Sequence, residues 1–214
     1  MAHNIYNLII LDRSGSMTSI RNEAVNGVNE TLGTIRSFAR RNPLSRQFVT
    51  LLAFCSCEMQ YIYNCAEAST TRNIRPDDFR PCCCTPLYDA IGLSCKEISR
   101  ALKSDPDAKV SVTIITDGYE NDSKEWNGPT IKKLIESLKT EGWLFAYIGA
   151  DHDVEKAAMT ISIENTLTFD KTPQGTARMF EQERACRESW MAEASCDCAP
   201  GCCNENYFNR GNRQ

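Results

Sequence analysis

The stretch from Asn4 to Ser16, NIYNLIILDRSGS, decides the fold of this chain. Its first eight residues are mostly apolar and are typical of a strand, which ends at the acid Asp12. Ser14 and Ser16 follow, so a carboxylate and two hydroxyls stand at alternate positions of one loop. Gly15 allows this loop to curl, because glycine adopts backbone angles that other residues avoid. Oxygens at this spacing can converge on one hard cation such as Mg²⁺.

Outward from this stretch, strand-like runs alternate with amphipathic helical stretches, a pattern typical of an α/β domain with a mainly parallel sheet. The predicted strands are 4–11, 47–54, 58–63, 110–116, 143–149 and 166–169, and the predicted helices are 18–40, 86–102, 130–139, 154–159 and 172–194. The third strand follows the second so closely that we expect a hairpin at the sheet edge. The sequence therefore predicts one domain over residues 1–194, followed by a Cys-rich tail at 195–214 that lacks a hydrophobic period.

Two further residues belong with the Asp12 loop. Thr85 opens a predicted helix in the sequence TPLYDA, and the apolar run VSVTIIT ends at Asp117, which Gly118 follows. In a doubly wound sheet, the carboxyl ends of the strands gather at one edge, so Asp12, Thr85 and Asp117 should meet there. Two carboxylates and three neutral hydroxyls suit Mg²⁺, which prefers oxygen ligands. The positive end of the first helix opposes a cation by only about 0.3 to 1 kcal/mol.

These motifs resemble the metal-ion-dependent adhesion site of von Willebrand factor A domains, with all five family positions filled: Asp12, Ser14, Ser16, Thr85 and Asp117. The resemblance covers roughly residues 4 to 170. It implies a Rossmann-like, six-stranded, mainly parallel sheet in the order 3-2-1-4-5-6, with a short antiparallel edge strand and helices on both faces. It also implies bound Mg²⁺ or Mn²⁺ and a protein partner that contributes an Asp or Glu carboxylate. The stretch 147–153 further resembles small stand-alone bacterial or phage members.

Three other interpretations exist for the same residues. Asp12 and Ser16 could simply cap the first helix, with Asp117 starting a turn. Asp12 could be the nucleophile of a phosphatase-like hydrolase. The haloacid dehalogenase-like phosphatases, however, carry the motif Asp-x-Asp, whereas this chain has Ser14 at the position of the second acid. A serine hydrolase is disfavoured too, because the loop lacks the Gly-x-Ser-x-Gly elbow. We therefore predict a binding module without catalysis of its own.

The loop after Asp117 offers candidate partner contacts. Tyr119 and Trp126 are aromatic, and exposed aromatics are enriched in interface cores, although burial against the sheet is the alternative. The polar residues 120–122 either shape the rim of a binding face or form a solvated loop. In the later loop, Asp153 is expected to cap the next helix and His152 to be exposed.

The 12 cysteines are unevenly placed. Those near the predicted site are Cys55, Cys57, Cys82, Cys83 and Cys84, and those near the C-terminus are Cys186, Cys196, Cys198, Cys202 and Cys203. Thiolates select Zn²⁺ or Cu⁺, but Cys-x-Cys is tighter than the usual Cys-x2-Cys of zinc sites. Free thiols are favoured for the first group and free or oxidised thiols for the second, and a thiol-bound zinc scaffold remains the alternative.

Composition narrows the function classes. The chain has 214 residues, and 24 basic against 28 acidic residues give a net charge of −4, whereas nucleic-acid binders usually carry a basic domain or stripe. Apolar runs such as residues 8–11 are far shorter than the roughly 20 residues of a membrane span. The N-terminus shows no secretory signal. We therefore expect a cytoplasmic protein that binds neither nucleic acid nor membrane.

Overall fold

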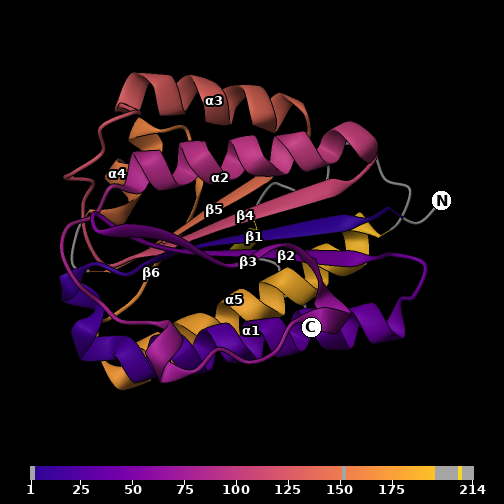
Figure 1. Ribbon diagram of the computed structural model, residues 1–214, viewed down its shortest axis with the longest axis horizontal. Helices are drawn as coiled ribbons and strands as arrows, with labels where there is room; N and C mark the ends of the chain where they lie inside the picture. Colours follow the sequence, from indigo (N-terminus) through magenta and orange to yellow (C-terminus); the bar gives the residue numbers. More distant parts are fainter. Residues whose placement is uncertain (1–2, 151–152, 196–206, 209–214) are drawn as a thin grey trace.

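The computed structural model describes residues 3–150, 153–195 and 207–208. They form one six-stranded sheet between two layers of helices (Figure 1). The strands are β1 (Ile5–Asp12), β2 (Gln47–Cys55), β3 (Glu58–Glu67), β4 (Lys109–Thr116), β5 (Leu144–Gly149) and β6 (Asn165–Thr168). The α-helices are α1 (Arg21–Arg41), α2 (Leu87–Ala101), α3 (Gly128–Thr140), α4 (Val154–Thr160) and α5 (Pro173–Ala194). Short 3₁₀ helices span Gly15–Ile20, Ala68–Thr70, Pro76–Asp78 and Leu102–Ser104.

The sheet has the order β3-β2-β1-β4-β5-β6, in which only the β2–β3 pair is antiparallel. The predicted fold class, strand order and antiparallel edge are therefore confirmed. β1 lies at the centre of the sheet, and all eight of its residues are buried. Because β1 and β4 are parallel neighbours, their carboxyl ends lie together and bring Asp12 close to Asp117.

Each face of the sheet has its own hydrophobic core, because alternate residues of β1 point to opposite faces. Ile9 and Leu11 pack with α1 and α5, while Leu8 and Ile10 pack with α2, α3 and α4. Figure 1 shows α1 and α5 below the sheet and α2 and α3 above it. The long apolar stripes predicted on these helices thus each cover one face.

Two element boundaries differ clearly from the prediction. The sequence predicts the first helix from residue 18, but a 3₁₀ helix over Gly15–Ile20 precedes α1. Here Thr18 donates from its side chain to the Gly15 carbonyl at 2.7 Å, which favours the tighter turn. β3 also extends to Glu67 instead of ending at residue 63. Its pairing with β2 shifts register, and Cys65 has a positive φ of 46°, so an irregularity hides the alternation that identifies strands.

A buried polar network joins α5 to the sheet. The Arg187 guanidinium is fully buried, and its Nη2 lies 2.7 Å from Glu183 Oε1 on the previous turn of α5. The same guanidinium donates to Asn7 Oδ1 at 2.9 Å and to Thr113 Oγ1 at 2.8 Å. Tyr207 is buried beside this network, and its hydroxyl lies 3.5 Å from Glu183 Oε1. α5 is therefore attached to β1 and β4 by charge as well as by apolar packing.

The C-terminal cysteines fall into two groups. Cys186 is buried within α5, in the core beneath the sheet, and so is separate from the tail. The other four, at 196, 198, 202 and 203, lie outside the described residues. Within the predicted tail, Tyr207 and Phe208 are described, and both are buried against the α1 and α5 core.

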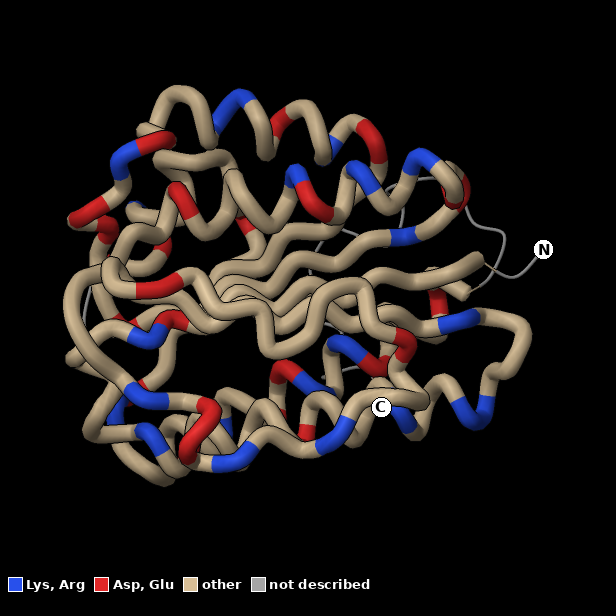
Figure 2. The backbone as a smooth tube through the Cα atoms, viewed as in Figure 1, with Lys and Arg blue, Asp and Glu red and all other residues tan. Residues whose placement is uncertain are grey.

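Acidic and basic residues are both present along the described helices, while the central strands carry few charges (Figure 2). This distribution agrees with the small net charge and offers no basic stripe along the helices that are described. Among the described residues, no helix is long and apolar enough to cross a membrane.

Gly27 of α1 is a point of very close approach between the two helices beneath the sheet. A Cβ at this position would overlap the ring of Phe180 in α5. We expect Gly27→Ala to destabilise the protein by about 1 to 3 kcal/mol, because the ring has to move within a packed core. The matched control is Gly33→Ala in the same helix, where the nearest atom lies 3.8 Å away. This control should stabilise by up to about 1 kcal/mol, and urea unfolding of both variants measures the difference. Equal effects would contradict the close contact.

Candidate metal centre

Asp12 is the last residue of β1 and is completely buried. Its Oδ1 accepts a hydrogen bond of 2.6 Å from the Ser14 backbone N–H, and its Oδ2 accepts one of 2.6 Å from the Thr116 hydroxyl. Thr116 ends the neighbouring strand β4. The carboxylate of Asp12 is therefore held from both sides, and its orientation is fixed by the loop and the adjacent strand.

The two serines of the loop connect Asp12 to Asp117. The Ser14 and Ser16 hydroxyl oxygens are 3.0 Å apart, and Ser16 donates to Asp117 Oδ1 at 2.6 Å. Asp117 is only 4% exposed. Four of the five predicted ligand residues thus form one hydrogen-bonded cluster at the carboxyl ends of β1 and β4.

Thr85 lies just before α2 and is buried. Its segment is fastened to the Asp12 loop, since Gly15 N–H donates to the Cys83 carbonyl at 3.0 Å and Cys82 N–H donates to the Arg13 carbonyl at 2.9 Å. The structure therefore brings Thr85 to the same edge of the sheet as the other predicted ligands.

Asn121 holds Thr85 from the opposite side. Its side-chain Oδ1 accepts from the Thr85 N–H at 2.8 Å, and its own N–H donates to the Thr85 carbonyl at 3.2 Å. Glu120 accepts from the Tyr88 N–H at 2.9 Å at the start of α2. Asp89 of α2 in turn accepts from the Trp126 N–H at 2.8 Å. The polar loop after Asp117 therefore positions the start of α2 and is more than a solvated segment.

Burial disfavours the charged form of the Asp12 carboxyl. Desolvation raises the pKa of its carboxyl from an ordinary 3.8 to about 6, against the lowering effect of the hydrogen bonds from Thr116 and Ser14, and the charge of Asp117 raises it further. A nearby cation would reverse this balance, because it favours the ionised carboxylate. The site therefore has an excess of negative charge that a divalent ion would relieve.

Asp117 provides a second sign of a cation site. Its Oδ2 is buried, and among the described residues no donor meets it in hydrogen-bond geometry. Lys171, in the loop after β6, places its Nζ 2.5 Å from this oxygen, a contact that is an ion pair by distance. This oxygen therefore already attracts a positive charge, which a metal ion would share or displace. With two carboxylates and three hydroxyls nearby, the donors present fit Mg²⁺ or Mn²⁺.

Lys171 left no signal in the sequence, because it reaches the site from a loop that is distant along the chain. Thr116 and Asn121 were also missed as positioning residues. For Thr116 a signal existed, because it ends a buried strand directly before Asp117. For Asn121 the only signal was its place in the polar loop that follows.

The two aromatic residues of this loop have different environments. Trp126 is partly buried and packs over Gly92 of α2, with the Lys96 ammonium 4.5 Å from its ring centroid. It is thus a structural contact that packs on α2 and the core above the sheet. Tyr119 is 55% exposed, and its hydroxyl accepts from the Asp153 N–H at 3.0 Å. More than half of the Tyr119 side chain can therefore still contact a partner.

The hydrolase alternatives gain no support from the described residues. Position 14 carries a hydroxyl hydrogen-bonded to Ser16, where a phosphatase of the Asp-x-Asp type would have its second acid. His3 precedes β1, at the opposite end of the strand from Asp12, and His152 lies outside the described residues. Asp153 caps α4 as predicted, accepting from the Lys156 N–H at 3.1 Å.

No protein-family model matches the sequence, and no curated protein matches it. Similarity appears at the level of structure. Proximal thread matrix protein 1 from the mussel byssus superposes with a TM-score of 0.60 at 14% identity, over 93% of this chain and 48% of that one, so this chain spans about half of its length. The SpRpn10 VWA domain superposes with a TM-score of 0.59 at 11% identity, over 85% of this chain and 95% of that one.

A third similar structure is the vWF domain of the type V pili tip protein Mfa5 from Porphyromonas gingivalis. Its TM-score is 0.59 at 10% identity, over 93% of this chain and 98% of that one. Identities this low establish the fold alone. The fold of this chain is that of a von Willebrand factor A domain, in agreement with the resemblance of its motifs.

Proposed function

We propose that this chain is a divalent-cation-dependent protein-binding module. Its ligands for Mg²⁺ or Mn²⁺ are Asp12, Ser14, Ser16, Thr85 and Asp117. The observation that carries the proposal is the buried pair of carboxylates linked through the serine hydroxyls, with a cationic partner, Lys171, at one oxygen of Asp117. Similar folds in a pilus tip protein and in a thread matrix protein support a role in binding rather than in catalysis.

The residues of the site have distinct tasks. Thr116 and the Ser14 N–H orient Asp12, and Asn121 fixes the segment that carries Thr85. The hydroxyls contribute oxygens without adding negative charge, so a bound ion would keep one electrophilic position for the carboxylate of a partner's Asp or Glu. Lys171 would then share Asp117 with the ion.

The surface beside the site can accommodate the rest of a partner. A groove of about 290 Å³ is lined by Tyr88, Tyr119 and Tyr147 together with polar and apolar residues of α4 and its neighbours, among them Lys156, Ala157 and Thr160. Tyr119 is exposed at its edge. Tyrosines give large, rigid contact areas and are enriched in interface cores, so the groove suits side chains adjacent to the partner's carboxylate.

Peptide selection tests the proposal even while the partner is unidentified. We expect random peptides selected on the protein in Mg²⁺ to share one Asp or Glu and to dissociate when Mg²⁺ is removed by dialysis. Thr85→Ala should weaken binding at least tenfold while the fold is retained, and Thr70→Ala, at an exposed threonine far from the site, should not. Changing the shared acid to its amide should abolish binding. Peptides without a common acid, or equally tight binding without Mg²⁺, would refute the mechanism.

Two narrower parts of the proposal rest on the sequence. The small stand-alone bacterial or phage type is proposed from the stretch 147–153, of which 151–152 lie outside the described residues. The cytoplasmic location is proposed from the cysteine content, because thiols stay reduced in that compartment. The composition also disfavours nucleic acid and membranes as partners.

A further inference from the structure

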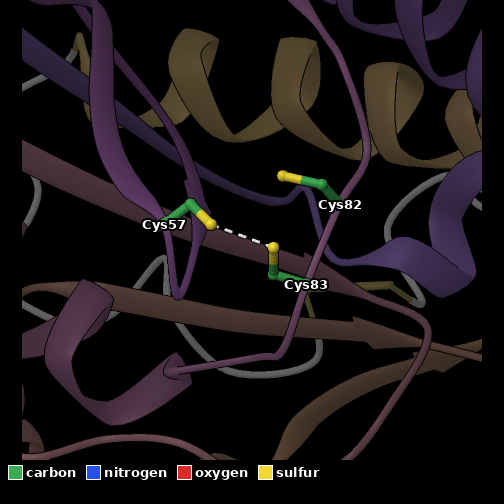
Figure 3. A group of neighbouring side chains, drawn as sticks. All are labelled: Cys57, Cys82 and Cys83. Carbon is green, nitrogen blue, oxygen red and sulfur yellow. Dashed lines mark hydrogen bonds between the residues drawn. The ribbon is translucent and has the colours of Figure 1, made fainter.

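Four cysteines from two separate segments meet beside the candidate metal centre. Cys55 ends β2 and Cys57 lies in the β2–β3 turn, while Cys82 and Cys83 precede Thr85. The Cys57 and Cys83 sulfurs are 2.9 Å apart, and the Cys55 and Cys82 sulfurs are 3.5 Å apart. The sulfurs of Cys57, Cys82 and Cys83 all lie within 4.8 Å of one another. Figure 3 shows Cys57 on the turn facing Cys83 on the neighbouring segment.

These separations are somewhat shorter than the edges of a metal–thiolate tetrahedron. With Zn–S bonds of about 2.3 Å, two sulfurs of a tetrahedral zinc site lie roughly 3.8 Å apart. A disulfide would instead require about 2.05 Å. The Cys57–Cys83 and Cys55–Cys82 distances lie between the disulfide value and the zinc value. Cys55 contacts Cys82 but lies outside the group of three sulfurs that are mutually within 4.8 Å, so its side chain has to turn toward the other three for one ion to bind all four thiols.

The backbone holds the two segments together independently of the sulfurs. Ser56 N–H donates to the Cys84 carbonyl at 3.1 Å, and the Cys84 N–H donates to the Ser56 hydroxyl at 3.0 Å. Cys83 has a φ of 62°, a left-handed conformation that non-glycine residues rarely adopt. This conformation carries the Cys83 sulfur to Cys57. The backbone therefore holds the cysteines close together, and Cys83 adopts an unfavourable conformation that a cysteine without a role in this cluster would not need.

The positive charge of Arg13 favours the ionised form of the neighbouring Cys55, and several ionised thiols close together favour a bound cation. Burial acts to raise the pKa of the Cys55 thiol, but hydrogen bonds, first of all from the Arg13 guanidinium at 3.5 Å, outweigh it and lower the pKa. Neighbouring thiolates repel one another, so they become ionised together only when a cation neutralises them.

We propose that Cys55, Cys57, Cys82 and Cys83 bind one zinc ion in a structural tetrathiolate site. Arg13 contacts Cys55 and offsets part of the negative charge of such a site. The site would fix the segment that leads into Thr85. This segment also contacts the Asp12 loop, because the Cys83 carbonyl accepts a hydrogen bond from the Gly15 N–H. Zinc bound here would stabilise the loops that surround the proposed Mg²⁺ site. It would use only cysteine ligands, so the oxygen ligands of the Mg²⁺ site would stay available. The proposal does not depend on the proposed protein-binding function.

Metal analysis of the full chain tests this site. The tail cysteines are first changed to serine, Cys196, Cys198, Cys202 and Cys203 together, so that they cannot contribute zinc. We expect protein purified under reducing conditions to retain one zinc per chain, and cobalt substitution to give the intense visible absorption of a tetrahedral cobalt thiolate. Cys57→Ser combined with Cys83→Ser should lose the zinc and the cobalt spectrum. Cys84→Ser, at the adjacent exposed thiol, should keep both.

Three outcomes would overturn the zinc site. The first is protein without metal in which mass spectrometry of the unreduced chain finds disulfides between these cysteines. The second is metal-free protein with four freely reacting thiols after zinc has been supplied during refolding. The third is zinc that survives the Cys57 and Cys83 changes. A melting response to Mg²⁺ that persists in the zinc-free variant would show that the proposed Mg²⁺ site is separate, so the two proposals fail or succeed independently.

Discussion

Replacing Asp12 with asparagine is expected to abolish the stabilisation of this protein by Mg²⁺. An ion that binds only the folded state stabilises it by about 2.7 kcal/mol at a hundredfold excess over Kd, which raises the melting temperature by several degrees. Asparagine keeps the size of the side chain but loses the charge, and it cannot accept hydrogen bonds with both of its terminal atoms as Asp12 does from Ser14 and Thr116. Thermal unfolding with increasing Mg²⁺ measures the loss.

The control for this experiment is Asp107→Asn. Asp107 is an exposed acid in the loop before β4, so it lies at the amino ends of the strands, away from the site at their carboxyl ends. It should respond to Mg²⁺ as the parent does. Mg²⁺ is best added to dialysed protein without EDTA, because a chelator would also remove the proposed zinc. An equal response of Asp12→Asn and the parent would mean that the ion binds elsewhere.

The same substitution should change the pH dependence of the metal-free protein. The folded-state pKa of Asp12 is raised by burial to about 6, above its ordinary 3.8, so the folded state holds an extra proton between these values. Its contribution to stability is therefore fully present below about pH 4 and is lost as the pH rises through 6. Asp12→Asn should remove this loss, which is of the order of a few kcal/mol. Mg²⁺ competes with the same proton, so binding to the parent should weaken below pH 6.

The fold could be predicted because its determinants are local. Buried strands such as β1 and β4 are continuous apolar runs, and each ends at an acid, so a parallel sheet must collect those acids at one edge. The loop motif then predicted which residues meet there. Asp12, Ser14, Ser16 and Asp117 do form one cluster, and their role as ligands stays a prediction.

Other features depend on tertiary packing and left no periodic signal. Lys171 reaches Asp117 from the loop after β6, and Asn121 bonds to Thr85 through a loop whose composition only indicates solvation. The sequence places both cysteine groups near the site, but it gives no sign of the left-handed backbone of Cys83 within the cluster. In α5 the buried face includes Glu183 and Arg187, which bond this helix to the sheet. These two charged residues interrupt the apolar stripe that would identify the buried face from sequence.

The network around Arg187 should make a large contribution to stability that one substitution removes. Arg187→Met deletes the guanidinium and leaves Glu183 buried without its ion pair, and Asn7 and Thr113 without their donors. Removing one partner of a buried ion pair typically costs about 3 to 5 kcal/mol. Urea unfolding should therefore show a midpoint far below that of the parent. The matched control is Arg184→Met, which breaks an ion pair with Glu30 at the surface of the same helix and should cost no more than about 1 kcal/mol.

A second change distinguishes the lost ion pair from lost packing. If most of the cost of Arg187→Met comes from the unpaired charge, then adding Glu183→Leu should restore part of the stability, because an apolar pair of similar volume avoids the desolvation of both ions. Tyr207, whose hydroxyl lies 3.5 Å from Glu183, would lose that neighbour in the double variant and limits the recovery. Equal stability of Arg187→Met and Arg184→Met would contradict the buried network. A double variant less stable than the sum of its two single changes would show that packing around the methylene groups, and not the charge of Glu183, attaches α5 to the sheet.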